Sequence, residues 1–402
     1  MLILMLASAN LPRLILNLMK NFIAIFCATV FFCGFTFARP NPQVLEIGSP
    51  LPPFELLGID GKTYTPDDFA DADVLAILFT CNHCPASVAA SKRIEAIHQD
   101  FKDRGVALIG VNPNHPGSLR PAELGFSPYN DSFEEMAPFA ADMGWTFPYL
   151  YDGETQKFAR ACGTQATPHV FVFDAERKLR YTGRMDDAGR SRGTVAKSYI
   201  RNAIEALLAG REVADPVTRA MGCSTKWHHL SESVAANQQR WEALPVTLDD
   251  LDADLAARLR NNKSGNVRII NFWATICGPC IIEFPELVET YRRFQNRNVD
   301  FISISVDHPD RRAAALKFLE SQHASIASRT KSSLEREGRT SNNYIWTGGN
   351  PDVLAEAVDA EWSGALPHTV IIAPGGEISW RFTGKVDPFE LRRQLLRTLD
   401  EK

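Results

Sequence analysis

The stretch NFWATICGPC (residues 271–280) places two cysteines, Cys277 and Cys280, directly after an apolar run that ends at Trp273. The stretch AILFTCNHCP (residues 76–85) repeats this pattern in the first half of the chain. A short, continuous apolar run is typical of a strand that is buried on both faces. The sequence therefore predicts two buried strands, each of which leads into a Cys-x-x-Cys pair.

The similarity between the two halves continues after each pair. A second apolar run follows after a gap long enough for a helix, and then an X-Pro-His sequence opens a strand–turn–strand pattern. Strands that alternate with helices predict an α/β fold, here two tandem domains in which helices flank a central mixed sheet. The matching segments are VALIGVN (106–112) and VDFISISVD (299–307), then TPHVFVF (167–173) and LPHTVII (366–372).

The domain limits follow from the helix that closes each copy. Apolar residues at helical spacing predict these last helices at 198–210 and 389–399. The segment 211–245 contains Pro216 and Gly222 and is predicted to be a linker between domains 44–210 and 246–400.

Composition and the first residues bear on location. The chain has 402 residues and a net charge of -5, so no basic excess favours a nucleic-acid partner. Residues 1–38 contain only two charged residues and end in an apolar run followed by small residues, which is the form of a secretory signal peptide. We expect an exported, periplasmic protein, or a membrane-anchored one if this segment is retained.

A Cys-x-x-Cys pair at the start of a helix is suited to disulfide exchange. Free backbone N–H groups and the helix dipole favour the thiolate of the first cysteine, and the second cysteine lies one turn further on. On this reasoning Cys81 and Cys277 are the predicted nucleophiles, and Cys84 and Cys280 the predicted resolving thiols. The reaction requires no bound cofactor. A metal site is not expected either, because each pair has its own domain.

The prolines after the pairs have a predicted role in substrate binding. Thr167-Pro168 and Leu366-Pro367 open strands at a similar distance from the two pairs. A cis-proline loop there would present backbone groups to an extended substrate. An ordinary edge-strand proline is the alternative, but its repetition in both copies favours the loop. Cys162 and Cys223 stay open between a third redox partner and a small buried residue.

The first copy resembles the peroxiredoxin-like branch of the redoxin (AhpC/TSA-related) family over residues 44–227, through CNHCP (81–85), TPHVFVFD (167–174) and GCSTKW (222–227). This resemblance aligns Cys84 with the peroxide-reacting cysteine and puts Cys81 where that family has threonine. His83 lies inside the pair, where an imidazolium would stabilise a thiolate and make the site more oxidising.

The second copy resembles the TlpA/ResA-type thioredoxins over residues 246–400, through FWATICGPC and LPHTVII. The two resemblances together imply tandem thioredoxin-like domains. Glu283 matches an acidic residue that tunes thiol protonation in ResA-type proteins; a plain surface glutamate is the alternative. Asn271 replaces the buried aspartate of thioredoxin, and Ile276 replaces the usual tryptophan.

These features predict an exported thiol-disulfide oxidoreductase that acts at both pairs through mixed disulfides. Its expected partners are cysteine-containing proteins and a thiol electron donor such as a membrane reductase. Two alternatives remain open. One is a thiol peroxidase that uses Cys84 with the second domain as reductant, and the other is a non-catalytic module that holds cysteine-containing clients.

Overall fold

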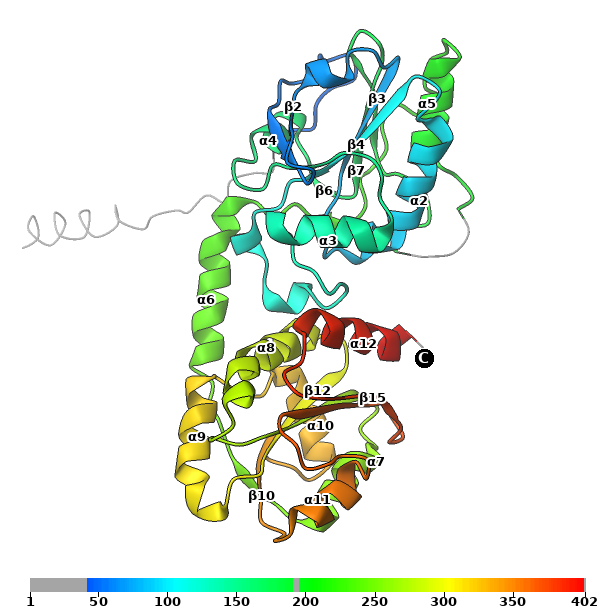
Figure 1. Ribbon diagram of the computed structural model, residues 1–402. Coiled ribbons are helices and arrows are strands. Elements are labelled where there is room, and N and C mark those ends of the chain that lie inside the picture. Colours follow the sequence, from blue (N-terminus) through cyan, green and yellow to red (C-terminus); the bar gives the residue numbers. More distant parts are fainter. Residues whose placement is uncertain (1–41, 191–194, 401–402) are drawn as a thin grey trace, which may run out of the picture. The chain divides into compact units, whose positions relative to one another are not determined.

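The computed structural model describes residues 42–190 and 195–400 (Figure 1). The predicted leader, residues 1–38, lies outside these ranges. Within them, no helix combines the length and the hydropathy that crossing a bilayer requires.

The first domain is built on a seven-stranded mixed sheet. The three inner strands β5, β4 and β3 run parallel, and the hairpin β7–β8 continues the sheet in antiparallel orientation from β3. The strands in their order across the sheet are β2 (Thr63–Tyr64), β1 (Leu56–Gly58), β5 (Tyr149–Tyr151), β4 (Val106–Asn112), β3 (Val74–Phe79), β7 (His169–Phe173) and β8 (Leu179–Gly183).

Strand β3 explains why the first apolar run is continuous. Successive side chains of a strand point to opposite faces of the sheet, and here both faces are covered. Val74, Ala76 and Leu78 join one core cluster, whereas the residues between them join a second cluster on the other face. Helices α2 (Pro85–Phe101), α3 (Phe133–Met143) and α5 (Tyr199–Leu208) contribute to the first cluster, and α4 (Lys157–Cys162) to the second.

The second domain repeats this plan with a six-stranded sheet. Its order is β10 (Asp249–Leu251), β13 (Asn343–Trp346), β12 (Val299–Ser305), β11 (Val267–Trp273), β14 (His368–Ile372) and β15 (Ile378–Thr383). Helices α8 (Gly278–Phe294), α9 (Arg312–Ser321) and α12 (Pro388–Asp400) cover one face, and α7 (Ala253–Asn261) and α11 (Pro351–Val358) the other. In the described ranges the remaining helices are α6 (Ser231–Glu242) and α10 (Ser328–Arg336), and short 3-10 turns lie at 66–69, 116–118, 121–123, 228–230 and 309–311.

The internal repeat is confirmed strand by strand. Strands β3, β4, β7 and β8 have the same order and directions as β11, β12, β14 and β15. The closing helices predicted at 198–210 and 389–399 are α5 and α12. Both X-Pro bonds, Thr167-Pro168 and Leu366-Pro367, are cis. The chain thus has the predicted α/β, thioredoxin-like architecture in each half.

The predicted linker 211–245 is wrong in its central part. Residues 217–227, which we call the strap, belong to the first domain. Thr218 N–H donates to Thr182 O at 3.0 Å, and the Trp227 side chain is buried in the core cluster behind the sheet. Between these anchors, strand β9 (Cys223–Ser224) pairs with β6 (Ala166–Thr167). A local reading of Pro216 and Gly222 could not reveal these long-range contacts.

The second sheet also encloses a cluster of charges. Asp300 is completely buried on β12 and lies 2.8 Å from Arg339 and 3.5 Å from Arg268. The Asn342 amide donates to its other oxygen at 2.8 Å, and Glu337 contacts both arginines at 2.7 Å. Removing one member of such a buried network leaves an uncompensated charge in the interior.

We therefore expect Asp300→Ala to lower the free energy of unfolding of the second domain by about 3–5 kcal/mol. Urea titration of the full chain, read out by hydrogen exchange of peptides from β12, measures this change. The matched control is Asp310→Ala, because the Asp310 side chain is 89% exposed. A loss below about 1 kcal/mol, the range of a surface ion pair, would contradict the structural role of Asp300.

Candidate functional site

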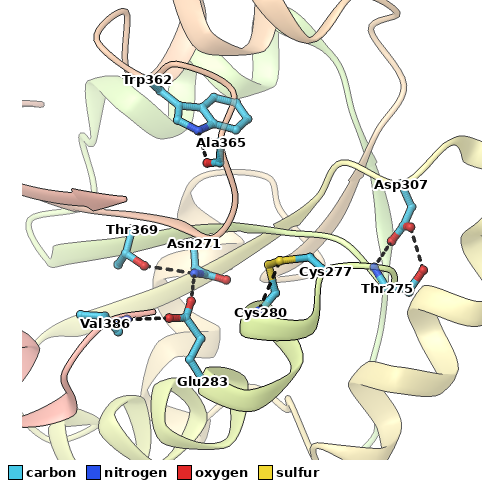
Figure 2. The surroundings of a disulfide bond; sticks show 10 residues. All are labelled: Asn271, Thr275, Cys277, Cys280, Glu283, Asp307, Trp362, Ala365, Thr369 and Val386. Atoms are coloured by element: carbon cyan, nitrogen blue, oxygen red, sulfur yellow. Dashed lines mark hydrogen bonds between the residues drawn. A yellow bond between two sulfur atoms is a disulfide. The ribbon is translucent and has the colours of Figure 1, made fainter. Parts of the chain in front are cut away.

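The second-domain pair lies at the start of α8, as predicted. Cys277 is the N-cap residue, and its sulfur accepts a hydrogen bond from the N–H of Cys280 at 3.3 Å. The two cysteines form a disulfide in this structure (Figure 2). Cys277 is half-buried, whereas Cys280 is 1% exposed. Another thiol can therefore approach Cys277 more readily than Cys280, as expected for a nucleophile and a resolving thiol.

A buried aspartate fixes the turn before this pair. Asp307 follows β12, and its carboxylate accepts hydrogen bonds from Thr275 N–H at 2.8 Å and Thr275 Oγ1 at 2.7 Å (Figure 2). Asp307 closes the VDFISISVD motif, but the sequence alone assigned it no role. It holds the segment between β11 and Cys277.

Glu283 lies inside the domain and not on its surface. It is 3% exposed, and its carboxylate accepts hydrogen bonds from the Asn271 amide at 3.0 Å and from Val386 N–H at 2.8 Å (Figure 2). Burial outweighs these two bonds and raises the pKa of Glu283 to about 7. The alternative of a plain surface glutamate is therefore wrong. Glu283 changes charge near neutral pH one helical turn from Cys280.

The cis-proline loop of the second domain is partly accessible, and exposed isoleucines flank the disulfide in the sequence. Leu366 is half-buried, and Pro367 accepts a hydrogen bond from Gly384 N–H at 2.8 Å. Ile276 is 79% exposed and Ile282 66% exposed, on either side of the disulfide in the sequence. In the part of the chain that the structure describes, no strand pairs with residues 366–367.

The first-domain pair differs in its position on the helix. Helix α2 begins at Pro85, so Cys84 and not Cys81 is the N-cap residue. The expectation that Cys81 caps the helix is therefore wrong, because the helix starts three residues later than predicted. Both Cys81 and Cys84 are fully buried free thiols.

The two thiols of this pair have opposite electrostatic environments. Hydrogen bonds with the thiols of Cys223 and Cys81, together with the charge of His83, hold the pKa of Cys84 well below its usual range despite burial. Burial, the hydrogen bond with Cys84 and the charge of Asp131 raise the pKa of Cys81 well above its usual range. When protonated, Cys84 donates to Thr167 O at 3.1 Å. These directions favour Cys84 as the thiolate, which reverses the predicted roles within this pair.

His83 is hydrogen-bonded to a buried aspartate that the sequence did not single out. Asp131 accepts a 2.6 Å hydrogen bond from His83 Nδ1, and its other oxygen accepts the N–H groups of Asn82 and His83 at 2.9 and 3.1 Å. Burial opposes the imidazolium, but Asp131 outweighs it and raises the pKa of His83. A positive charge beside Cys84 agrees with the predicted role of His83 in tuning the thiols.

One group of side chains has the composition of a metal site. Ligand atoms of Cys81, His83 and Asp131 lie within 4.8 Å of one another. Asp131 already accepts four hydrogen bonds, the fourth from the Asn114 amide at 2.7 Å. The hydrogen-bonding capacity of its carboxylate is therefore used by protein groups. This geometry favours a carboxylate that keeps a proton on His83 Nδ1 over one that binds a metal ion.

The predicted substrate-binding residues of the first domain contact the pair directly. The Thr167 hydroxyl lies 3.1 Å from the sulfur of Cys81, and the carbonyl of Thr167 precedes the cis bond to Pro168. The edge of this loop is occupied, since β6 pairs with β9 of the strap. The two sites thus share one architecture, but the chain covers the first and leaves the second accessible.

Comparisons with known proteins agree with this architecture. Residues 46–198 match the Redoxin family and residues 241–381 match the AhpC/TSA family. The chain therefore carries two Redoxin/AhpC-TSA domains in tandem. The sequence motifs predicted a redoxin (AhpC/TSA-related) domain for the first copy and a TlpA/ResA-type thioredoxin domain for the second.

Two curated relatives are named thiol-disulfide oxidoreductase ResA. The one from Halalkalibacterium halodurans is 29% identical over 69 residues, which are 17% of this chain and 38% of the relative. The one from Geobacillus kaustophilus is 27% identical over 126 residues, which are 31% of this chain and 59% of the relative. The chain thus spans less than two thirds of the length of either relative. Among solved structures, an uncharacterized conserved protein from Geobacillus kaustophilus is 33% identical, with a TM-score of 0.41 and coverage of 46% of this chain and 94% of that one.

The burial of Glu283 leads to a prediction about stability. Its pKa of about 7 in the folded protein lies above the ordinary value of 4.5. Between these pH values the folded state binds more protons than the unfolded state. The free energy of unfolding is therefore undiminished by Glu283 below pH 4.5, and it falls as pH rises to about 7. Glu283→Gln removes this loss, which amounts to roughly 2–3 kcal/mol.

Urea titrations of the oxidised protein across this pH range measure the effect. The difference in unfolding free energy between Glu283→Gln and wild type is expected to grow with pH. Glu320→Gln, at an exposed position of α9, serves as the control. A difference that stays constant with pH would show that Glu283 does not titrate in this range.

Proposed function

We propose that this protein is an exported thiol-disulfide oxidoreductase whose two Cys-x-x-Cys pairs exchange disulfides with cysteine-containing proteins. The observation that carries the proposal is the Cys277–Cys280 disulfide, with the half-buried Cys277 at the N-cap of α8. The names of the ResA relatives support the same activity. The proposed location rests on the signal-like residues 1–38.

In the proposed reaction, the reduced second domain attacks a client disulfide through the thiolate of Cys277. The first helical N–H groups stabilise this thiolate, since the sulfur already accepts the N–H of Cys280 in the oxidised state. A mixed disulfide forms and one client thiol leaves. Cys280 then attacks the sulfur of Cys277, which releases the second client thiol and produces the disulfide seen here. A thiol donor outside the chain, such as a membrane reductase, restores the dithiol.

The surroundings of Cys277 suit a protein client. Ile276 and Ile282 offer exposed apolar surface beside the pair. Among the described residues no strand pairs with residues 366–367, so the backbone groups of Leu366 can pair with an extended segment. Apolar contact and backbone pairing are largely independent of sequence. We therefore propose that several different cysteine-containing clients are accepted.

Reduction of insulin disulfides by the full chain, with dithiothreitol as electron donor, tests this proposal. Cys277→Ser is expected to lower the rate at least about a hundredfold, because it removes the attacking sulfur of the accessible pair, whereas the first pair is fully buried and covered by the strap. Cys280→Ser is expected to accumulate a mixed disulfide between Cys277 and insulin, detectable on a non-reducing gel. Cys162→Ser, a buried thiol behind the first sheet, is the matched control. Equal rates for wild type and the Cys277→Ser, Cys81→Ser and Cys84→Ser variants would refute the proposal.

A thiol peroxidase is the second candidate, and the position of Cys84 favours it. Cys84 caps α2, precedes Pro85 and lies within the Redoxin match. The thiolate of Cys84 would attack one peroxide oxygen and break the O–O bond, and the other oxygen would leave and be protonated to water or an alcohol. The resulting sulfenic acid would condense with a neighbouring thiol to give a disulfide and water.

Consumption of hydrogen peroxide by the reduced full chain separates the two candidates. A peroxidase is expected to lose this activity at least about a hundredfold in Cys84→Ser and to keep it in Cys277→Ser during a single turnover. Peroxide consumption that is no faster than that of free cysteine would exclude the peroxidase and leave the oxidoreductase.

A further inference from the structure

The strap occupies the position that a client would take at the first site. Strand β9 runs antiparallel to β6, with Thr167 opposite Cys223 and Ala166 opposite Ser224. Residues 166–167 directly precede the cis-proline, where an extended client is proposed to pair. The chain thus places its own extended segment, with a cysteine in it, against the first redox pair.

The approach of this segment is close enough to require a glycine. A Cβ atom at Gly222 would lie 1.9 Å from the carbonyl oxygen of Thr167, which is far inside van der Waals contact. Only a residue without a side chain lets the two backbones come so near.

Cys223 makes direct contact with the pair. Its N–H donates to the sulfur of Cys84 at 3.4 Å, and its side chain packs against the buried cluster of Cys81, Cys84 and Ala86. The hydrogen bond to Cys84 and burial raise the pKa of Cys223, so its proton is held while Cys84 carries the charge. Cys162, by contrast, belongs to the core cluster on the other face of the sheet. Three thiols therefore meet at the first site, and Cys223 is the one supplied by the strap.

The strap has features of a segment that can be released. It is anchored at one end by Thr218 and at the other by Lys226 and Trp227. A cavity of about 460 Å³ lies along it between these anchors. Val217 and Met221 are 61% and 44% exposed. The middle of the strap thus contributes little apolar burial, and local opening there is less costly than opening of the core.

We propose that Cys223 is a third redox-active cysteine, held by the strap in the client position of the first domain, and that it forms a disulfide with Cys84. The proposal rests on the proposed function, because the first disulfide of the pair is supplied by exchange. Starting from a Cys81–Cys84 disulfide, the sulfur of Cys223 attacks the sulfur of Cys84. The Cys84–Cys223 bond forms and the Cys81–Cys84 bond breaks. Cys81 leaves as a thiolate and takes up the proton that Cys223 gives up, so no external oxidant is consumed in this step.

This exchange gives the first domain two alternative oxidised forms. In one, the disulfide lies within the pair and the strap is joined only by hydrogen bonds. In the other, the strap is covalently fixed over the cis-proline loop and the site is closed to clients. A client that enters the first site must displace the strap, so Cys223 competes with client thiols for Cys84.

Peptide mapping of the oxidised full chain tests the proposal. The reduced protein is treated with limiting oxidised glutathione, quenched with acid, blocked with N-ethylmaleimide and digested with trypsin. Cys81 and Cys84 lie on the tryptic peptide 63–92, Cys223 on 220–226 and Cys162 on 161–177. We expect the linked pair 63–92/220–226 to form at least about a tenth of the oxidised first domain. This share corresponds to a preference of Cys84 for Cys81 over Cys223 of no more than about tenfold. In Cys81→Ser it becomes the main product.

The matched control moves the thiol by one residue. In the double variant Cys223→Ser, Ser224→Cys the thiol points to the opposite face of β9, so the linked peptide is expected to disappear. The proposal is overturned if Cys81→Ser keeps glutathione on Cys84 without any link to 220–226. If the intra-pair disulfides form and insulin is reduced but this link is absent, the proposed function stands and this inference alone fails. If neither pair becomes oxidised by glutathione, the proposed function fails with it.

A second variant tests the strap without altering a cysteine. Gly222→Ala forces the strap away from Thr167, and we expect the linked peptide to decrease and maleimide labelling of reduced Cys84 to become about tenfold faster, as local opening becomes easier. Met221→Ala, at an exposed position of the strap, is the control and should leave both readings unchanged. Equal labelling of Cys84 in wild type and Gly222→Ala would show that the strap does not cover the pair.

Discussion

The chemistry of both domains depends on a cysteine sulfur placed at the first free N–H groups of a helix. In the second domain Cys277 caps α8 and accepts the N–H of Cys280. In the first domain Cys84 caps α2. Cys84 is the second cysteine of its Cys-x-x-Cys motif, whereas Cys277 is the first cysteine of its own. The unpaired N–H groups and the dipole of a helix favour negative charge only within its first turn. The residue at which each helix begins therefore decides which sulfur lies where the helix favours a thiolate, and at Cys84 the thiols of Cys223 and Cys81 lower the pKa further.

A buried carboxylate supports each of these turns, but it does so differently. Asp307 accepts hydrogen bonds from Thr275 and so fixes the chain before Cys277. Asp131 accepts backbone N–H groups inside the first pair and also holds the charge of His83. The first site thus has the buried Asp131–His83 pair beside its thiols, in which Asp131 raises the pKa of His83, whereas the second has Glu283, whose pKa lies at about 7. This difference gives the two domains a physical basis for different reduction potentials.

The two sites also differ in access. The cis-proline loop of the second domain is free of strand partners among the described residues, and exposed isoleucines adjoin its disulfide. The same loop of the first domain pairs with β9, and its two cysteines are fully buried. The two domains therefore share a fold, but the redox pair of the second domain is accessible and that of the first is covered by another segment of the chain. The covering segment brings a third thiol with it.

The sequence by itself determined the duplicated α/β fold, the two Cys-x-x-Cys pairs and the proline that follows each pair, whereas the structure showed that both X-Pro bonds are cis. The sequence could do so because continuous apolar runs, helical periodicity and X-Pro bonds are local signals with a direct structural meaning. Only the tertiary structure decided that Cys84 caps its helix, that Glu283 is buried, that Asp131 and Asp307 support the turns, and that residues 217–227 form a strap. Each of these depends on contacts between residues far apart in the chain, such as Thr167 with Cys223, and no local pattern encodes the distance between such residues.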